Sequence, residues 1–416
     1  MRKLKNLLSN PKALLFGDQA VYSGTSFLLT LFIARNFSKE EFGTYSLWLI
    51  GVYFILNIIS TLSIQQYQVL APGFKEYKSY KSFNLFLLLA LLILSVLIVF
   101  GAISPFLSDF ERLQEFKLVI VIFGIGFLLH DFLRRFAIAN DHIRTAFFMD
   151  VSYTFLVVLL SVAQYLFAFS FKNFMVLFPL VYFPAVVIGI LQFRNESIET
   201  KHWKYFMSQH WQHGKWLVLS AMVQWWSSNL FVLASGLYLG IEALGAFRLV
   251  QSLFGLLNVF LQAIENYAIP TAARIYNEFS IPRTVDYLNK LSLKTVIAFG
   301  LVLAMLFLYA TPLLVLAAGE GYENYGFVVK GMVILYGIII IGYPIRIGIR
   351  ILLLNKYNLT GYLFSLLISF VSFHFLLERF QLVGAIAGLI CSQLILLSFW
   401  YYALRRQKFY IWKSYI

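Results

Sequence analysis

Two arginines, Arg346 and Arg350, lie four residues apart within the apolar stretch GYPIRIGIRILLLN. On an α-helix this spacing places both side chains on one face. Guanidinium groups carry forked donors that match phosphate oxygens, and Pro344 would kink a helix beside them. The pair therefore predicts an anion-binding site, with Arg346 roughly 12 Å from the nearer end of its apolar run at 1.5 Å per residue. The alternative is that both side chains extend to the headgroups of a membrane.

Three further basic residues stand near the ends of apolar segments: Arg35, Arg248 and Lys330. Arg35 and Arg248 each flank a short turn that contains a glutamate. They could bind an anion, or they could anchor the chain at a membrane interface by pairing with Glu40 and Glu242. Lys330 lies just inside its segment and has the same two interpretations.

Carboxylates inside apolar runs are costly, which makes each one a candidate for ion binding. Asp18 is the sole carboxylate of LLFGDQAVYSG, and Glu265 lies near the end of a later run. Either could bind a coupling H⁺ or Na⁺, and Asp18 could instead pair with a basic residue of a neighbouring segment. Asp131 precedes Arg134 and Arg135 by three and four residues, which favours a local salt bridge but keeps it an ion-coupling candidate.

The run MVQWWSSNLF, residues 222–231, combines polar and aromatic side chains within an apolar segment. Its polar groups could bind hydroxyl-rich molecules while its indole rings stack on them. The alternative is packing between helices, to which such groups also contribute. The candidates are Gln224, Trp225, Trp226, Ser228 and Asn229.

Several function classes lack their motifs. The chain has no G-x-x-x-x-G-K-[ST] phosphate loop, and its histidines lack the cysteine or carboxylate pattern of a zinc site. We expect no cofactor and no metal. The net charge of +14 comes from dispersed basic residues rather than a basic stripe, so nucleic-acid binding is not indicated.

The elements that must position these residues follow from composition. The 416 residues are 60% hydrophobic and only 12% charged, which indicates a polytopic membrane protein. A spanning helix needs about twenty mostly apolar residues. By that rule we predict an all-α protein with twelve spans, at residues 13–35, 44–67, 83–106, 117–137, 147–169, 173–193, 215–238, 244–266, 291–317, 327–354, 358–377 and 380–403.

Most of the 33 Lys and Arg residues fall in alternate inter-span segments or at the adjoining helix ends, Arg134 and Arg135 among them. Basic residues favour the cytoplasmic side, so both termini are expected there. The remaining loops are short and lean acidic. No loop is long enough to be a separate catalytic domain, and we expect no enzyme.

The first turn is repeated 202 residues later, where FSKEEFGTY aligns with LGIEALGAF. Glu40 then matches Glu242, and Gly43 matches Gly245. Each turn joins the first two spans of a six-span half. We therefore expect two bundles, residues 1–193 and 215–416, related by a pseudo-two-fold axis along the membrane normal. Residues 194–214 would form a cytoplasmic amphipathic linker.

The first hairpin, LLTLFIARNFSKEEFGTYSLWLIG, resembles the opening of bacterial polysaccharide flippases. The shared pattern uses Arg35, Phe37, Glu40, Phe42, Gly43 and Tyr45. These Wzx-type lipid-linked oligosaccharide flippases form part of the multidrug/oligosaccharidyl-lipid/polysaccharide exporter superfamily. The motif covers about thirty residues, whereas the span count and the two-half layout cover the whole chain.

The resemblance implies translocation of an undecaprenyl-diphosphate-linked O-antigen or capsule repeat unit across the bacterial inner membrane by alternating access. Arg346, Arg350, Arg35, Arg248 and Lys330 would then bind the diphosphate, and the residue 222–231 run would contact the sugar. H⁺ or Na⁺ would drive transport. Membrane lipid, and a polymerase and chain-length proteins of the same pathway, would be partners.

Two alternatives remain within the same superfamily. A multidrug or cation antiporter would favour a more acidic site, which the intramembrane arginines argue against. A lipid II flippase would be expected to carry two spans more than the twelve predicted here.

Overall fold

The computed structural model describes residues 11–71, 74–98, 116–194, 199–279 and 281–413, and every regular element in these ranges is helical. The first half contains α2 (Pro11–Asn36), α3 (Lys39–Leu62), α4 (Ile64–Leu70), α5 (Tyr77–Leu97), α7 (Lys117–Ala139), α8 (Ile143–Phe167), α9 (Phe171–Leu177), η4 (Phe178–Tyr182) and α10 (Phe183–Phe193). The second contains α11 (Trp203–Leu239), α12 (Ile241–Glu278), α13 (Ile281–Leu308), α14 (Ala310–Ala318), η5 (Glu320–Tyr325), α15 (Gly326–Ile341), α16 (Tyr343–Ile351) and α17 (Asn355–Arg406).

The helices confirm the prediction of an all-α membrane protein with about twelve spans. Nine stretches of the described chain are long and apolar enough to cross a membrane. One of these, α17, is two helices joined at Gln381, whose φ of 51° breaks the helical path. Helices α2 and α7 add two more, at 26 and 23 residues, and carry buried charges. The part of the predicted span 83–106 beyond residue 98 lies outside the described residues.

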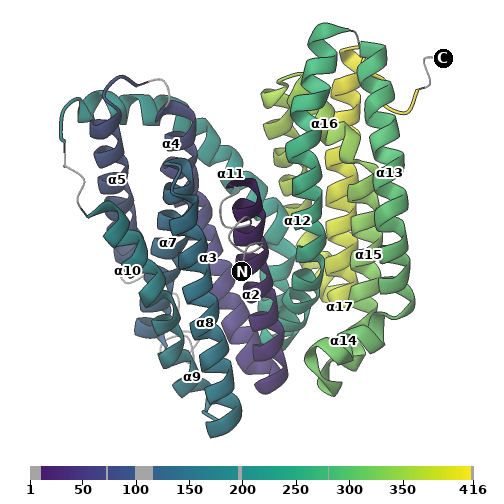
Figure 1. Cartoon of the computed structure of the whole chain (residues 1–416). Helices are drawn as coiled ribbons and strands as arrows, with labels where there is room; N and C mark the ends of the chain where they lie inside the picture. Colours follow the sequence, from purple (N-terminus) through teal and green to yellow (C-terminus); the bar gives the residue numbers. More distant parts are fainter. Residues whose placement is uncertain (1–10, 72–73, 99–115, 195–198, 280, 414–416) are drawn as a thin grey trace, which may run out of the picture. The chain divides into compact units, whose positions relative to one another are not determined.

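The chain packs as two compact units. Unit 1 contains the described residues up to Leu29 together with those of Trp48–Met222. Within it, α8 packs against α7 and α10, and η4 lies against both α7 and α8 (Figure 1). Its interior is rich in aromatic side chains, including Phe123, Phe178 and Tyr182.

Unit 2 contains Thr30–Leu47 and the chain from Val223 onward. In it, α15 packs against α13 and α17, and α16 packs against α12 and α17 (Figure 1). Residues of the first turn therefore belong to the same packed unit as the second half. The domain boundaries expected at residues 193 and 215 remain a prediction.

The two turns that the sequence aligned pack on each other within unit 2. A Cβ atom on Gly43 would lie 2.2 Å from the backbone oxygen of Ile241, and one on Gly245 would lie 2.9 Å from Cα of Gly43. Only glycine fits at such a distance. Equivalent residues of two repeats touch each other where a local two-fold axis passes between them, so this contact supports the repeat.

The expected linker forms the start of α11. From Trp203 the chain is helical and buries Phe206 and His210 against Tyr80 and Phe83 of α5. Trp211 on the same helix is exposed. The segment is thus two-sided, and its contact with headgroups remains a prediction; residues 195–198 lie outside the described residues.

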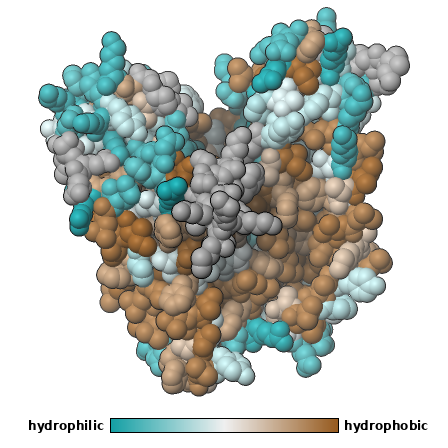
Figure 2. All heavy atoms as spheres, viewed as in Figure 1, coloured by the Kyte–Doolittle hydropathy of each residue, from teal (hydrophilic) through white to brown (hydrophobic). Residues whose placement is uncertain are grey.

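The surface fits a membrane environment. Figure 2 shows apolar side chains over the middle of each unit's visible face and hydrophilic ones gathered toward its ends. Many large apolar side chains of the described residues are well exposed, such as Leu94, Tyr165, Leu301 and Val371. Lipid tails cover such side chains, which would otherwise form large aggregation-prone patches in water.

Candidate functional site

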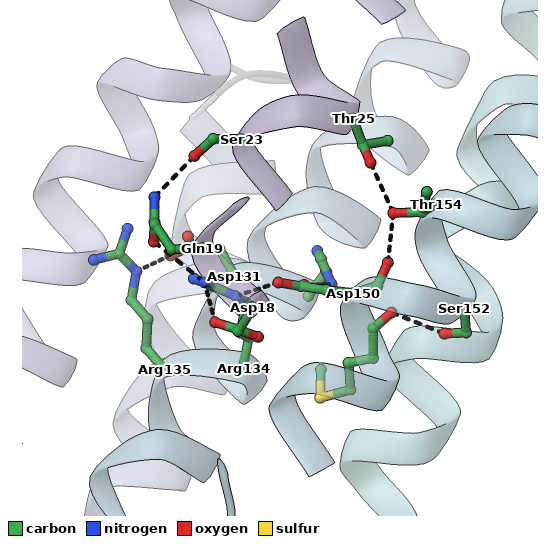
Figure 3. Close-up of polar contacts among 12 residues, drawn as sticks. Asp18, Gln19, Ser23, Thr25, Asp131, Arg134, Arg135, Asp150, Ser152 and Thr154 are labelled. Carbon is green, nitrogen blue, oxygen red and sulfur yellow. Dashed lines mark hydrogen bonds and ion pairs between the residues drawn. The ribbon is translucent and has the colours of Figure 1, made fainter. Parts of the chain in front are cut away.

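Unit 1 holds a buried ion-pair cluster centred on Arg134 of α7 (Figure 3). Its Nε donates to Oδ2 of Asp150 on α8 at 2.7 Å, and its Nη2 pairs with Oδ2 of Asp18 on α2. The three residues are between 0% and 4% exposed. One guanidinium therefore joins two carboxylates from different helices. Gln19 adds a weaker acceptor, its Oε1 lying 3.4 Å from Nη2 of Arg134.

The burial of Arg134 was not expected from the sequence. Its position near a helix end placed it among the basic residues of a cytoplasmic segment. The structure instead buries it five residues before the end of α7, where Asp18 and Asp150 compensate its charge. Neighbouring Arg135 is the one that reaches the surface, with a side chain 42% exposed.

His130 lies one helical turn before Arg134 and completes the cluster. Its Nε2 is 3.1 Å from Oδ1 of Asp150, and the residue is fully buried. Tyr22, Tyr153 and Tyr182 pack around its ring at centroid distances of 5.7, 5.3 and 5.8 Å. These rings separate the charged groups from the surroundings.

Backbone and hydroxyl contacts fix the acidic side of the cluster. Thr154 donates to the backbone oxygen of Asp150 at 2.8 Å, and its hydroxyl meets that of Thr25 on α2 at 2.7 Å (Figure 3). Helices α2 and α8 are thereby tied together beside the carboxylates. Asp150 is a functional candidate that the sequence analysis missed, although a lone carboxylate within an apolar span was a usable signal.

The salt bridge expected from the LLHDFLRRF spacing is present. Nε of Arg135 donates to Oδ2 of Asp131 at 2.8 Å, one turn along the same helix. Asp131 itself is almost fully buried. The pair is electrically neutral, so it adds no net charge to the neighbouring cluster. Whether Asp131 takes part in ion coupling remains a prediction.

Unit 2 holds a second cluster, in which arginines outnumber carboxylates. Glu265 of α12 pairs through Oε1 with Nη1 of Arg350, and the same oxygen lies 3.8 Å from Nε of Arg346. Both arginines are on α16, where their spacing of four places them on one face as predicted. The Glu265 side chain is 8% exposed, whereas those of Arg346 and Arg350 are 33% and 48% exposed.

The local fold explains this placement. Helix α15 ends at Ile341 and α16 begins at Tyr343, with Gly342 between them and Pro344 in the first turn of α16. This break is the predicted kink, since proline tolerates a first turn but not a helix interior. The Tyr343 hydroxyl donates to Oε2 of Glu265 at 3.0 Å and lies against the Leu261 carbonyl. Tyr343 thus orients the carboxylate, a role that the sequence did not reveal.

The remaining basic candidates are separate from this cluster. Arg35 donates to the backbone oxygen of Leu316 at 3.3 Å, and Arg248 donates to Oε1 of Gln251 at 3.0 Å. Lys330 is exposed, with its Nζ 5.6 Å from the centre of the Phe307 ring. The structure therefore brings together only two of the five arginines and lysines proposed for one anion.

The polar run of α11 divides into an inward and an outward side. Ser227 is buried and shares a hydrogen bond with Ser365, which in turn contacts Ser392. Gln224, Trp226 and Ser228 are exposed, and Trp225 and Asn229 are half-buried. Ser228 and Asn229 hydrogen-bond the backbone of their own helix, at Gln224 and Trp225. Packing thus involves Ser227, and the neighbouring candidates keep an accessible side.

Comparison with known proteins identifies the class of fold. No protein-family model matches the sequence, and no curated protein matches it. The structure is similar to that of a multidrug resistance MATE family transporter of the MOP superfamily in an inward-facing conformation, with a TM-score of 0.75 and 11% identity over 94% of this chain and 95% of that one.

Two further structures extend the similarity. The lipid II flippase MurJ in an inward closed conformation gives a TM-score of 0.67 with 12% identity, covering 93% of this chain and 86% of that one. A MOP superfamily transporter from Pyrococcus furiosus gives 0.63 with 13% identity, covering 96% and 97%. The chain therefore has the fold of MOP superfamily transporters. These three proteins are two transporters and a flippase by their descriptions.

Proposed function

We propose that the chain is a flippase that moves an undecaprenyl-diphosphate-linked oligosaccharide, an O-antigen or capsule repeat unit, from the cytoplasmic to the periplasmic face of a bacterial inner membrane. The observation that carries the proposal is the accessible arginine pair of α16, Arg346 and Arg350, in a transporter fold. A diphosphate is the part of this substrate that a pair of forked donors recognises.

Glu265 compensates part of the positive charge of the arginine pair when no substrate is bound. A single carboxylate meets two guanidinium groups, so the cluster carries an excess positive charge. Each arginine keeps donors beyond those that face Glu265. A diphosphate brings more negative charge than Glu265 and more oxygens, and it would therefore compete for the same guanidinium groups.

The sugar and the coupling ion would use other residues. Gln224, Trp225, Trp226, Ser228 and Asn229 offer hydrogen-bonding and stacking groups on the accessible side of α11. Asp18, Asp131 and Glu265 are the carboxylates proposed to couple transport to an ion gradient. Arg35, Arg248 and Lys330 would contact the diphosphate at other stages of its passage. A polymerase and chain-length proteins would receive the product.

Replacement of Arg346 by Ala tests the proposal. We expect surface polysaccharide to fall at least about tenfold, since a charged hydrogen bond contributes about 1.5–3 kcal/mol. Lys290→Ala is the control, because this side chain is 72% exposed and pairs with Asp286 on the same helix. Normal polysaccharide from the Arg346 variant at equal protein level would contradict the proposal.

A multidrug or cation antiporter is the second candidate. It is favoured by the buried carboxylates Asp18 and Asp150 and by the similarity to a MATE transporter. In this case the Arg346 variant would still export a cationic dye from loaded vesicles, and the wild-type protein would do so without a lipid-linked sugar. The flippase proposal expects no dye export by either protein.

A further inference from the structure

We infer that a basic patch at the end of α17, made of Arg405, Arg406, Lys408 and Lys413, binds the headgroup of an anionic phospholipid. The occupant is a lipid of the leaflet next to this end of the chain, recognised by its net negative charge. The inference goes beyond the proposed function, because it concerns a lipid that is held at the surface and not transported. It can be tested without the lipid-linked oligosaccharide.

The chain turns back at the end of α17 through a capping turn. The Phe409 amide donates to the Leu404 carbonyl at 3.0 Å. The Lys408 amide donates to the Arg405 carbonyl, also at 3.0 Å, which completes a Schellman motif. Lys408 has the left-handed conformation of this motif, with a φ of 58°. Glycine is the usual residue there because it has no Cβ, so the chain places a charged side chain where glycine would fit better.

The tail beyond this turn is held against unit 2. Phe409 is fully buried, and a Cβ atom at Gly348 of α16 would lie 3.3 Å from its ring, so the ring packs on that helix. Asn289 of α13 accepts from the Trp412 amide at 2.9 Å and donates to the Lys413 carbonyl at 3.4 Å. Figure 1 shows this end of the chain beside α13. The basic side chains of the patch are therefore attached to a backbone of defined position.

Aromatic rings restrict the arginines of the patch. The guanidinium carbon of Arg405 lies 5.7 Å from the ring centres of both Tyr401 and Tyr410. That of Arg406 lies 5.0 Å from the ring centre of Tyr402. A ring attracts a cation through its face and takes none of its N–H donors in a conventional hydrogen bond. Both arginines are thus oriented and keep donors for phosphate oxygens.

Exposed rings place the patch at the depth of lipid headgroups. Tyr402 and Trp412 are 51% and 48% exposed. The Trp412 ring stacks on Tyr401 at a centroid distance of 5.7 Å. Half-exposed Tyr and Trp side chains at the end of a spanning helix are typical of the membrane–water interface.

The positive charge of the patch has no acidic counterpart in its own part of the sequence. Glu378 is the last acidic residue, so residues 379–416 contain no Asp or Glu. On α13, which holds the tail, Asp286 already pairs with Lys290 at 2.8 Å. Clusters of Lys and Arg directly beyond a spanning helix attract anionic lipids.

Basic residues at the ends of spans also orient a membrane protein. Orientation requires only charge, and it would be served equally by a tail without fixed structure. Here the tail is capped, buried through Phe409 and hydrogen-bonded to Asn289, and its arginines lie over rings. This geometry favours a defined lipid site over a signal for orientation alone.

Native mass spectrometry of the purified full-length protein in detergent tests the inference, with phosphatidylglycerol as the anionic lipid and phosphatidylcholine as the zwitterionic comparison. We expect the wild type to bind phosphatidylglycerol at least about tenfold more tightly. Arg405→Gln/Arg406→Gln should weaken that binding about 25-fold, since each basic residue near an anionic headgroup contributes about fivefold. Equal affinity of the wild type for the two lipids would overturn the inference.

Lys408→Gly is a second variant that preserves the fold. Glycine favours the left-handed conformation, so this change removes the charge and keeps the turn. We expect about fivefold weaker binding of phosphatidylglycerol with an unfolding temperature that is unchanged or raised. Arg379→Gln is the matched control, because Arg379 is also an exposed arginine of α17 but lies beside Glu378 and the helix break at Gln381. A loss in this control as large as in the patch variants would contradict the assignment.

Two further variants separate a positioned site from net charge and from the cluster of the proposed function. Asn289→Ala keeps every charge and removes both side-chain hydrogen bonds to the tail, so phosphatidylglycerol should bind several-fold more weakly. Arg350→Gln should leave this binding unchanged. Wild-type affinity in Asn289→Ala, or a loss in Arg350→Gln alone, would overturn the inference. Polysaccharide export by Arg346→Ala bears only on the proposed function, so either proposal can fail without the other.

Discussion

The two units of the molecule each contain an arginine–carboxylate cluster, and the clusters have opposite character. In unit 1 two carboxylates surround one arginine, and Arg134 is 4% exposed. In unit 2 two arginines share one carboxylate, and their side chains are 33% and 48% exposed. With ionised carboxylates, the first cluster contains more negative than positive groups, and the second contains more positive than negative groups.

This difference indicates a division of labour. A buried cluster in which one guanidinium pairs with carboxylates of two other helices ties those helices together. An accessible cluster with spare donors suits an anionic group brought by a substrate. The same residue type is thus structural and ion-compensating in one unit and available for binding in the other.

The largest expected effect comes from removing Arg134. Arg134→Ala leaves Asp18 and Asp150 buried without their partner, which should lower the free energy of unfolding by about 3–5 kcal/mol. Arg350→Ala, at a half-exposed pair, should cost at most about 1 kcal/mol. Thermal unfolding of both variants in detergent measures the contrast. Equal destabilisation would remove the distinction between the two clusters.

Substrate binding should depend on the unit 2 cluster and not on unit 1, which is the reverse of the effect on stability. Arg135→Gln and Arg350→Gln alter side chains of similar exposure, 42% and 48%, each paired with one carboxylate. We expect Arg350→Gln to weaken binding of undecaprenyl diphosphate about 10–100-fold, because it removes charged hydrogen bonds of about 1.5–3 kcal/mol. Arg135→Gln should leave the affinity unchanged. Binding to protein in nanodiscs is the measurement, and a similar loss in both variants would contradict the assignment to unit 2.

The contact between the repeated turns gives a packing test within unit 2. A Cβ at Gly43 would lie 2.2 Å from the Ile241 backbone oxygen, so Gly43→Ala should cost about 1–3 kcal/mol of stability. Gly51→Ala on the same helix is the control, since nothing lies within 4 Å of its Cβ position. We expect that substitution to be neutral or slightly stabilising. An equal response of the two variants in thermal unfolding would show that the turns do not pack as described.

Glu265→Gln should change the affinity of the unit 2 cluster for anions less than the arginine variants do, and it should raise that affinity. Loss of the competing carboxylate frees both arginines, and we expect binding of inorganic pyrophosphate to tighten several-fold, or by about 1 kcal/mol. Isothermal titration calorimetry on the purified protein measures it. The control is Asp150→Asn in unit 1, which should leave the affinity unchanged. Weaker binding by Glu265→Gln would show that the carboxylate supports the anion instead of competing with it.

The smallest expected effect concerns His210 at the start of α11. Burial lowers its pKa below the usual value of 6.5. Its Nδ1 lies 3.0 Å from the Leu62 carbonyl and its Nε2 lies 2.6 Å from the Tyr80 hydroxyl, which together satisfy the neutral ring. The unfolded chain therefore binds the proton more tightly. The stabilisation is complete above about pH 6.5 and is lost as the pH falls toward the folded-state pKa.

Thermal unfolding across this pH range, compared with His210→Gln, checks the sign of the effect. The wild-type protein should lose stability on acidification by more than the variant does. A wild-type profile that rises toward low pH relative to the variant would contradict the burial of a neutral His210.

Much of the fold was predictable from the sequence because the membrane imposes a length on every element. The break at Gln381 and the kink before Pro344 both fell where apolar runs and proline indicated them. The Gly43–Gly245 alignment also indicated a repeat before any contact was known. The pairing of those two glycines with each other required the structure.

The candidate sites were only partly predictable. Arg346, Arg350 and Glu265 were identified as separate candidates, since charges within spans stand out individually. Their assembly depends on the packing of α12 against α16, which no local pattern encodes. The burial of Arg134 was not predictable for a related reason. A basic residue near a helix end has the same sequence pattern whether it reaches the surface or pairs with Asp18 and Asp150.

The most direct test of the account is binding of undecaprenyl diphosphate to the full-length protein in nanodiscs, comparing wild type with the double variant Arg346→Gln/Arg350→Gln. The account predicts a loss of affinity of about 100-fold or more, because both forked donors to the diphosphate are removed. An unchanged affinity, with the double variant folded as judged by its unfolding temperature, would show that the unit 2 cluster does not bind the diphosphate.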